Sequence, residues 1–288
     1  MIAVVGATGN TGCAVVKELK KLGHDPVCIV RNPDKARELL GADTKTAVAE
    51  LTDPAALEKA LQGAESAFLV TGANPQMVEQ ESNVMDAALK AGTKYLVHVS
   101  AVSAVARRDS ESMVGRSHYA IEEKLRGCGI GWVILRPGLF MQNIFGQAAS
   151  IKSDSKMVLP FAKDLPVALT DVRDTAAVGA RILIDPAAHT GKTYEFTGAV
   201  TTYAAFAEVF SQVLGRKIAY VGVTFEQAAQ AMKARNMPDW LVTHLVAIAK
   251  LGASGAFSTE NTGPITEIVK RAPLTTRQFV EDHKSLFA

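Results

Sequence analysis

The sequence is poor in cysteine. Only three of its 288 residues are cysteines, Cys13, Cys28 and Cys128, and no two of them have the C-x-x-C spacing. An odd, scattered set excludes a disulfide framework and a cysteine-based zinc site, and it indicates a reducing compartment. We expect the three thiols to be small buried apolar groups and the protein to hold no metal.

Charge of one sign and long apolar runs are also missing. The formal net charge is +2 and no basic stripe with interleaved aromatics occurs, so nucleic-acid binding through bulk charge is not expected. No segment approaches the roughly 18 apolar residues of a membrane span, and Met1 leads into a strand-like run rather than a signal peptide. We therefore expect a cytoplasmic protein without membrane association. A homodimer is compatible with this composition, which does not fix the oligomeric state.

Short apolar runs alternate with amphipathic helical segments up to about residue 137. The runs are rich in β-branched residues, and Asn-Pro and Asp-Pro pairs open two of the helical segments, which end at glycine. This alternation predicts parallel βαβ units with helices on both faces of the sheet. The expected strands are 2–5, 26–30, 45–50, 66–70 and 94–101, and the expected helices are 12–23, 32–41, 53–63 and 81–92.

The rhythm changes after residue 138. Residues 139–170 lack clear alternation, whereas 172–186, 202–215, 225–252 and 275–287 have helical patterns, the third interrupted at Pro238. We therefore expect an α/β protein with a Rossmann-type doubly wound parallel sheet in 1–138. Residues 139–288 are expected to form mainly a smaller, mostly helical substrate-binding part, while elements near 171–198 return to the first domain.

Three glycines stand in the first turn of the chain, in the sequence VVGATGNTG of residues 4–12. Gly6 permits a tight turn, Gly9 lets the backbone approach a pyrophosphate, and Gly12 lets the following helix pack closely on the strand. The spacing is G-x-x-G-x-x-G rather than G-x-G-x-x-G. Its place between the first strand and the first helix favours a dinucleotide site over a merely structural turn.

The end of the second strand distinguishes the two nicotinamide dinucleotides. An enzyme for NAD usually has an acidic residue there, which binds the ribose 2′-hydroxyl. In this sequence Arg31 takes that place and Lys35 follows four residues later. A guanidinium is well shaped to bind a 2′-phosphate, so these residues favour NADPH over a solvated surface pair. Asp34 lies nearby and is expected to cap a helix or face solvent.

Several stretches together resemble the NmrA-like atypical short-chain dehydrogenase/reductase family, and within it quinone oxidoreductase-like and triphenylmethane- or azo-dye-reductase-like members. The likeness runs through VVGATGNTG, Arg31, SHYAIEEKL (117–125) and WVILRPGLFMQN (132–143), and continues through 171–183, 191–198 and 275–283. The resemblance implies a Rossmann domain with NADPH along the carboxyl edge of its sheet. The residues that match the family's cofactor contacts are Gly6, Thr8, Gly9, Asn10, Thr11, Gly12, Arg31, Thr71, Gly72, Ala73, Ser100, Ala101, Pro137, Gly138 and Phe140.

The catalytic dyad common among short-chain dehydrogenases is absent. That dyad is Tyr-x-x-x-Lys, in which a lysine one helical turn away lowers the pKa of the tyrosine. Tyr119 is followed at that distance by Glu123, and Lys124 is rotated off the face. Tyr119 and His118 are therefore the catalytic candidates, and His118 shares a face with Glu122. Two roles stay open for His118, a proton donor or one half of a pair that supports the pocket.

Apolar residues follow the expected nicotinamide turn. Phe140, Met141, Asn143 and Phe145, joined by Trp240 from a later helix, are candidates to contact a planar aromatic substrate. For Phe145 and Trp240 a plain core role is an equal alternative. Quinones and dyes accept hydride readily, so a site without a strong acid suits them.

Together these features favour an NADPH-dependent oxidoreductase that transfers hydride to a quinone or similar conjugated aromatic acceptor. Two alternatives remain at this level. One is an NADPH-binding redox-sensing regulator without catalysis, and the other is a tailoring oxidoreductase of polycyclic aromatic metabolites.

Overall fold

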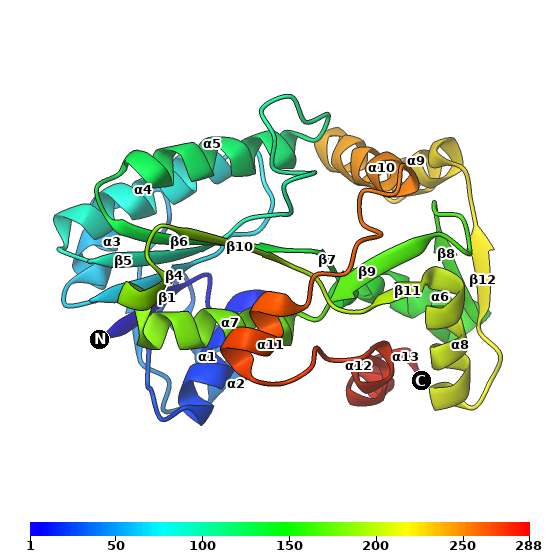
Figure 1. Ribbon diagram of the computed structural model, residues 1–288, viewed down its shortest axis with the longest axis horizontal. Helices are drawn as coiled ribbons and strands as arrows, with labels where there is room; N and C mark the ends of the chain where they lie inside the picture. Colours follow the sequence, from blue (N-terminus) through cyan, green and yellow to red (C-terminus); the bar gives the residue numbers. More distant parts are fainter.

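A seven-stranded parallel sheet forms the centre of the larger part of the molecule (Figure 1). The computed structural model describes all residues, 1–288. The strand order β10-β6-β5-β4-β1-β2-β3 contains the 3-2-1-4-5-6 order of a Rossmann sheet and adds β10 beside β6. The strands are β1 (Ile2–Val5), β2 (Val27–Val30), β3 (Thr46–Val48), β4 (Ser66–Leu69), β5 (Tyr95–Val99), β6 (Gly131–Pro137) and β10 (Lys192–Phe196).

Helices cover both faces of this sheet, as predicted for a doubly wound fold (Figure 1). On one face lie α1 (Asn10–Lys21), α2 (Pro33–Leu40), α7 (Val172–Ile184) and α11 (Gly263–Val269). On the other face lie α3 (Pro54–Leu61), α4 (Met77–Lys90) and α5 (Met113–Gly127). Each layer buries its own apolar cluster against the sheet, and this double burial explains why the strands are almost continuously apolar.

Two of the early helices begin where their capping residues predict. The side chain of Asn32 accepts hydrogen bonds from the amides of Asp34 and Lys35, and Asp53 caps α3 in the same way. A proline follows each cap at the first helical position, where a missing amide proton has no cost. By contrast, α4 begins at Met77, four residues before the predicted start. Its first residue has no capping side chain before it, so the sequence carries no local signal of where this helix begins.

The smaller part is built around a third apolar cluster and lies at the other end of the molecule (Figure 1). It holds a three-stranded sheet, β11-β9-β7, and a two-stranded pair, β12-β8. Its strands are β7 (Leu139–Phe140), β8 (Lys156–Leu159), β9 (Pro166–Thr170), β11 (Val200–Thr202) and β12 (Ala219–Gly222). Its helices are η1 (Met141–Gln147), α6 (Ala148–Asp154), α8 (Tyr203–Leu214), α9 (Phe225–Ala234), α10 (Asp239–Ala253), α12 (Thr276–Asp282) and α13 (Lys284–Phe287), while the short η2 (Pro186–His189) lies between α7 and β10.

The helix α10 connects the two parts. It packs against α9 and also contacts α5 near the start of that helix. There the hydroxyl of Ser112 and the Nδ1 atom of His244 are 2.7 Å apart. None of the helices is both long and apolar enough to cross a lipid bilayer.

The three cysteines are free thiols. Cys28 lies in the core, where burial raises the pKa of its thiol to about 11. Such a thiol stays protonated near neutral pH and is a poor nucleophile.

Candidate functional site

The three glycines of the first turn differ in what a side chain at each position would contact. Gly6 has a φ of +79°, and a Cβ there would collide with the carbonyl oxygen of Val70 at the end of β4. A Cβ on Gly12 would collide with the backbone of Gly6, so this glycine lets α1 start against the turn. Both positions are therefore fixed by contacts within the protein.

Gly9 is the exception. It is exposed, its φ is −83°, and the nearest atom to a Cβ placed on it is the Gly6 carbonyl oxygen at 3.4 Å. The fold itself thus leaves room for a side chain at Gly9. The unfilled space above this backbone fits the close approach of a ligand, which a Cβ would obstruct.

The first turn of α1 is open to an anion. Gly9 is its N-cap and supplies no side-chain hydrogen bond, and no acidic residue stands in the turn. The first amides of any helix lack partners within the helix and carry its positive dipole end, so they bind phosphate well. Asn10 is exposed and Thr8 partly exposed beside these amides, while Thr11 is buried.

Arg31 follows the carboxyl end of β2 and Lys35 lies in the first turn of α2, both with exposed side chains. Neither side chain forms an ion pair, although Asp34 stands between them along the chain. Asp34 instead pairs with Arg37 at 3.1 Å and, as expected, faces solvent. Two unpaired cations at this edge fit a phosphate group on the adenosine ribose.

Thr71, Gly72 and Ala73 follow β4, next to the glycine turn. The hydroxyl of Thr71 donates a 2.6 Å hydrogen bond to Oε1 of Glu81, which is fully buried on α4. Gly72 and Ala73 are exposed, and the Asn74 side chain holds the carbonyl of Gly72 at 2.8 Å.

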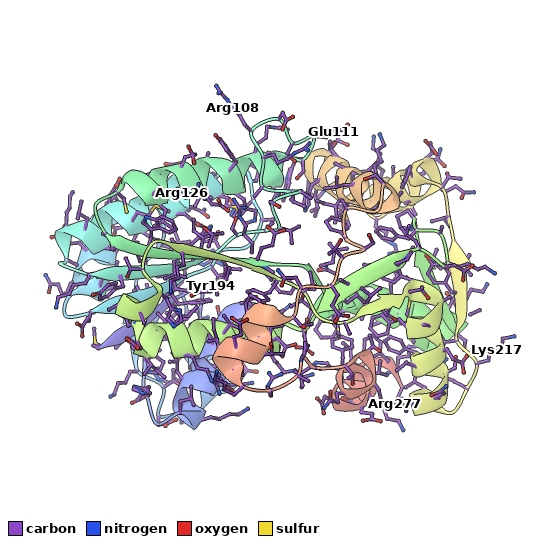
Figure 2. The ribbon with its side chains drawn as sticks, viewed as in Figure 1. Arg108, Glu111, Arg126, Tyr194, Lys217 and Arg277 are labelled. Carbon is purple, nitrogen blue, oxygen red and sulfur yellow. The ribbon has the colours of Figure 1, made fainter.

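Ser100 ends β5, and its hydroxyl donates a 2.6 Å hydrogen bond to Oε1 of Glu122 on α5. Glu122 is fully buried, and its oxygens also accept hydrogen bonds from Arg136 at 2.9 and 2.5 Å and from Arg126 at 2.7 Å. Arg126 is labelled in Figure 2. Burial alone raises the pKa of Glu122, but the hydrogen bonds from Arg136, Ser100 and Arg126 outweigh it and hold that pKa below its usual value. Glu122 is therefore a carboxylate with every acceptor position in use.

The turn after β6 is tightly packed. The Gly138 amide donates a hydrogen bond to the Phe196 carbonyl at 2.8 Å, and a Cβ on Gly138 would lie 2.9 Å from Cγ2 of Thr197. Pro137 and Gly138 are buried, whereas Ala101 and Phe140 are partly exposed. These residues occupy the same edge as Thr71 and Ser100, since parallel strands end together.

The structure keeps the two catalytic candidates apart from any charged partner. Lys124 pairs with Asp86 of α4 at 2.9 Å, so it is not available to Tyr119, which is partly exposed. Of the two roles left open for His118, pairing with Glu122 does not occur, because Arg136 and Arg126 occupy that carboxylate. The Nδ1 atom of His118 is buried without a partner, and burial together with the neighbouring His98 lowers the pKa of His118 to about 4. Its imidazole is therefore neutral near pH 7 and does not carry an acidic proton.

Two features of this edge were missed by sequence reasoning. One is Glu81, whose Oε2 lies 3.1 Å from Nδ1 of His98, with both side chains fully buried. The other is Arg136, which bridges Glu122 and Glu195, the latter at 3.8 Å. A glutamate on the apolar face of a predicted helix is the signal that could have drawn attention to Glu81.

The substrate candidates lie in different surroundings. Met141 is buried and Phe145 stacks on Phe279 with ring centroids 5.6 Å apart, so both pack in the core of the smaller part. Trp240 packs against the cluster beneath α3, α4 and α5. Asn143 is exposed and Phe140 partly exposed, which leaves these two open to a ligand.

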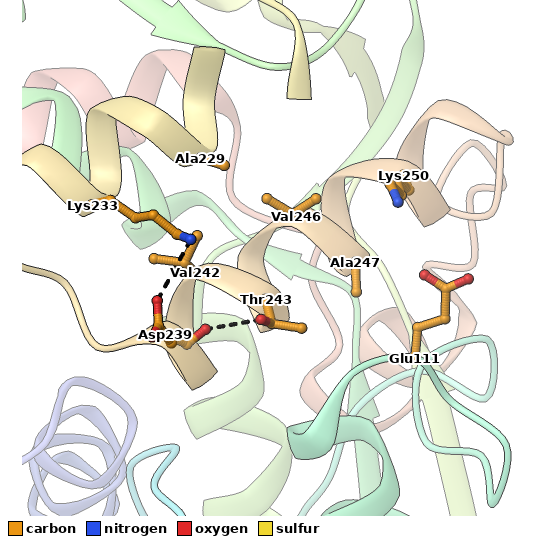
Figure 3. Close-up of a pocket in the computed structure, with 9 residues that line it drawn as sticks. All are labelled: Glu111, Ala229, Lys233, Asp239, Val242, Thr243, Val246, Ala247 and Lys250. Atoms are coloured by element: carbon orange, nitrogen blue, oxygen red, sulfur yellow. Dashed lines mark hydrogen bonds and ion pairs between the residues drawn. The ribbon is translucent and has the colours of Figure 1, made fainter. Parts of the chain in front are cut away.

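A pocket of about 390 Å³ lies between α9, α10 and the loop before α5 (Figure 3). Val242 and Val246 line it, and Lys233 pairs with Asp239 at 3.7 Å along one side. Glu111 approaches from the loop, whose Arg108 points into solvent (Figure 2). None of the predicted site residues lines this pocket.

The strand order and the glycine turn define a Rossmann-type α/β protein. The model of the NmrA-like family matches residues 1–274, and the chain belongs to this family.

Two curated relatives cover nearly the whole chain. The NAD(P)H azoreductase of Xenophilus azovorans is 31% identical over 292 residues, which cover 100% of this chain and 99% of that protein. Quinone oxidoreductase 2 of Escherichia coli (strain K12) is 31% identical over 281 residues, which cover 96% of each chain.

Solved structures have the same fold. The NADPH-dependent quinone oxidoreductase QOR2 from Escherichia coli, complexed with NADPH, has a TM-score of 0.84 at 29% identity and covers 98% of this chain and 99% of its own. The triphenylmethane reductase of Citrobacter sp., complexed with NADP(H), has a TM-score of 0.84 at 24% identity with the same coverage. At that lower identity the likeness shows the fold alone.

Proposed function

We propose that the protein is an NADPH-dependent oxidoreductase that transfers hydride to a quinone or a similar conjugated aromatic acceptor. The similarity to an NAD(P)H azoreductase and to a quinone oxidoreductase, each over nearly its whole length, supports this reaction class. The single structural observation that carries the proposal is the carboxyl edge of the sheet. There an open glycine turn follows β1, and two unpaired cations follow the neighbouring strand β2.

The residues along this edge indicate how a bound NADPH would be oriented. The amides that follow Gly9 would bind the pyrophosphate, and Arg31 with Lys35 would bind the 2′-phosphate over β2. Since β1, β4 and β5 lie side by side in that order, the nicotinamide end would extend toward Ser100. The chemistry that bound NADPH supplies is the transfer of a hydride.

The protein's own contribution would be to position and orient the hydride donor and the acceptor rather than to supply an acid. Lys124, the nearest lysine along the helix, pairs with Asp86 rather than with Tyr119, and His118 is neutral near pH 7. Reduction of a quinone spreads the incoming charge over a conjugated ring, so solvent can supply the proton that follows. A simple ketone lacks this delocalisation and needs a positioned acid. The site therefore favours conjugated acceptors.

Turnover separates this proposal from a redox-sensing regulator that binds NADPH without chemistry. NADPH oxidation is followed against a panel of quinones, azo dyes and aldehydes, with binding measured in parallel by calorimetry. We expect binding, with turnover on quinones or dyes. Binding without turnover on any acceptor would support the regulator instead, and preference for a polycyclic acceptor would favour a tailoring enzyme.

A further inference from the structure

The same arrangement occurs twice at the carboxyl edge of the sheet. After β4, the Thr71 hydroxyl donates to Glu81 at 2.6 Å, and after β5, the Ser100 hydroxyl donates to Glu122 at 2.6 Å. Each glutamate comes from the helix that follows its strand, and each is fully buried. Glutamate is almost never fully buried unless it is paired. The burial of two glutamates that each face a hydroxyl at neighbouring strand ends therefore needs an explanation.

The two hydroxyls are neighbours in the sheet. The register pairs Leu69 of β4 with His98 of β5, so two residues further along Thr71 lies beside Ser100. Both residues therefore stand one strand apart at the crevice where an open α/β sheet binds its ligand.

Each hydroxyl has one proton, and here that proton is already donated to a glutamate oxygen. The oxygen then has only lone pairs left, so toward a ligand it can accept a hydrogen bond but cannot donate one. Without the glutamate the hydroxyl would rotate and could do either. The glutamates thus fix the polarity of the side chains at this edge.

We propose that Glu81 and Glu122 are positioning residues that turn Thr71 and Ser100 into a pair of hydrogen-bond acceptors. This inference rests on the proposed function, and it names the part of the cofactor that the pair recognises. The matching donors are the ribose hydroxyls and the carboxamide N–H₂ group of the nicotinamide nucleoside. Thr71, closer to the glycine turn, takes a ribose hydroxyl. Ser100, one strand further from the phosphates, takes the carboxamide.

The surroundings of the two glutamates agree with this role. Glu122 is held by two arginines, so it stays a carboxylate and its orientation is fixed. The second oxygen of Glu81 lies 3.1 Å from Nδ1 of His98, while Oε1 accepts the hydrogen bond from Thr71. Neither hydroxyl caps the helix that follows its strand, so helix capping does not explain the presence of Thr71 or Ser100.

The test uses calorimetric binding of NADPH and of its reduced 3-acetylpyridine analogue, in which a methyl ketone replaces the carboxamide and removes the N–H donors. The unaltered protein is expected to bind NADPH about tenfold more tightly than the analogue, as one hydrogen bond allows. Ser100→Ala and Glu122→Gln should each remove this preference while binding of the analogue stays unchanged. Ser100→Thr, which keeps the hydroxyl, should retain the preference.

Variants of Thr71 and Glu81 are expected to affect both ligands equally, because both ligands carry the same ribose. Thr71→Val and Glu81→Gln should weaken the binding of NADPH and of the analogue by the same factor. The matched control is Thr93→Val, which removes a buried hydroxyl without a partner at the opposite end of β5 and should change neither affinity.

The Ser100 and Glu122 effects must also be coupled. The double variant Ser100→Ala/Glu122→Gln should bind NADPH no worse than Ser100→Ala alone. An unchanged preference for NADPH in Ser100→Ala would overturn the proposal even if Glu122→Gln failed to fold. Failure of the unaltered protein to bind NADPH at all would instead refute the proposed function.

Discussion

Replacement of Arg31 tests the choice between the two nicotinamide dinucleotides. Its guanidinium is exposed and has no ion-pair partner, so removing it leaves no orphaned charge in the protein. A charge-assisted hydrogen bond to a phosphate is among the stronger single contacts, but exposure and salt weaken it. For Arg31→Ala we expect a loss of NADPH affinity of about tenfold to a hundredfold at low salt, with NADH affinity unchanged.

The assay is calorimetric titration of both dinucleotides at two ionic strengths. Arg37→Ala is the matched control, because Arg37 is an arginine of the same segment that already pairs with Asp34. It should leave both affinities as they are. Equal affinity of the unaltered protein for NADPH and NADH would refute the reasoning, as would an equal effect of Arg31→Ala on both ligands.

Three further predictions follow from the geometry. Gly9→Val should abolish dinucleotide binding while the melting temperature stays within a few degrees, because the φ of −83° and the open space at Gly9 tolerate a side chain; normal NADPH binding by this variant would show that the turn is only structural. Tyr119→Phe and His118→Gln should each retain turnover on a quinone within about threefold at pH 7, since neither side chain is a poised acid; a hundredfold loss in either variant would identify a proton donor. The pKa of about 4 for His118 lies below the ordinary value of 6.5, so the unfolded chain binds more protons between these values and stability should fall as pH drops from 6.5 to 4, by up to about 3 kcal/mol. In urea unfolding, His118→Gln should reduce this fall of the unfolding free energy with pH, and His24→Gln should not. An unchanged fall in His118→Gln would assign the titration to another group.

Local signals account for the part of the fold that sequence predicted. Asn32 and Asp53 each stand before a proline, and both cap the helices that they were expected to cap. The helix α12, within the helical pattern of 275–287, likewise begins with a capping box between Thr275 and Gln278. These contacts span only three residues, so the chain carries the information within one turn.

The irregular stretch 139–170 could not be predicted, because its strands pair with residues far away in the sequence. Its strand β9 pairs with β7 and with β11, and the latter comes some thirty residues later, after α7 and β10 have returned to the large sheet. Each strand is short, and the pairing is set by the packing of the third apolar cluster rather than by local pattern.

The polar contacts of the candidate site also divide into local ones, which the sequence predicts, and long-range ones, which it does not. Helical spacing correctly placed His118 and Glu122 on one face of α5, but it said nothing about which strand side chain approaches that face. Arg136 of β6 and Ser100, just after β5, contact Glu122, so the alternative in which His118 pairs with Glu122 is not realised. Likewise Phe145 stands close to the expected nicotinamide turn in sequence, yet its ring packs against the C-terminal helix α12.

The most direct test of the central claim is steady-state turnover with NADPH saturating, on one quinone and one simple ketone of similar size. Delocalised charge on the ring and the lack of a poised acid predict efficient reduction of the quinone and slow or undetectable reduction of the ketone. Efficient reduction of the ketone, abolished by Tyr119→Phe, would contradict the account and identify a conventional carbonyl reductase.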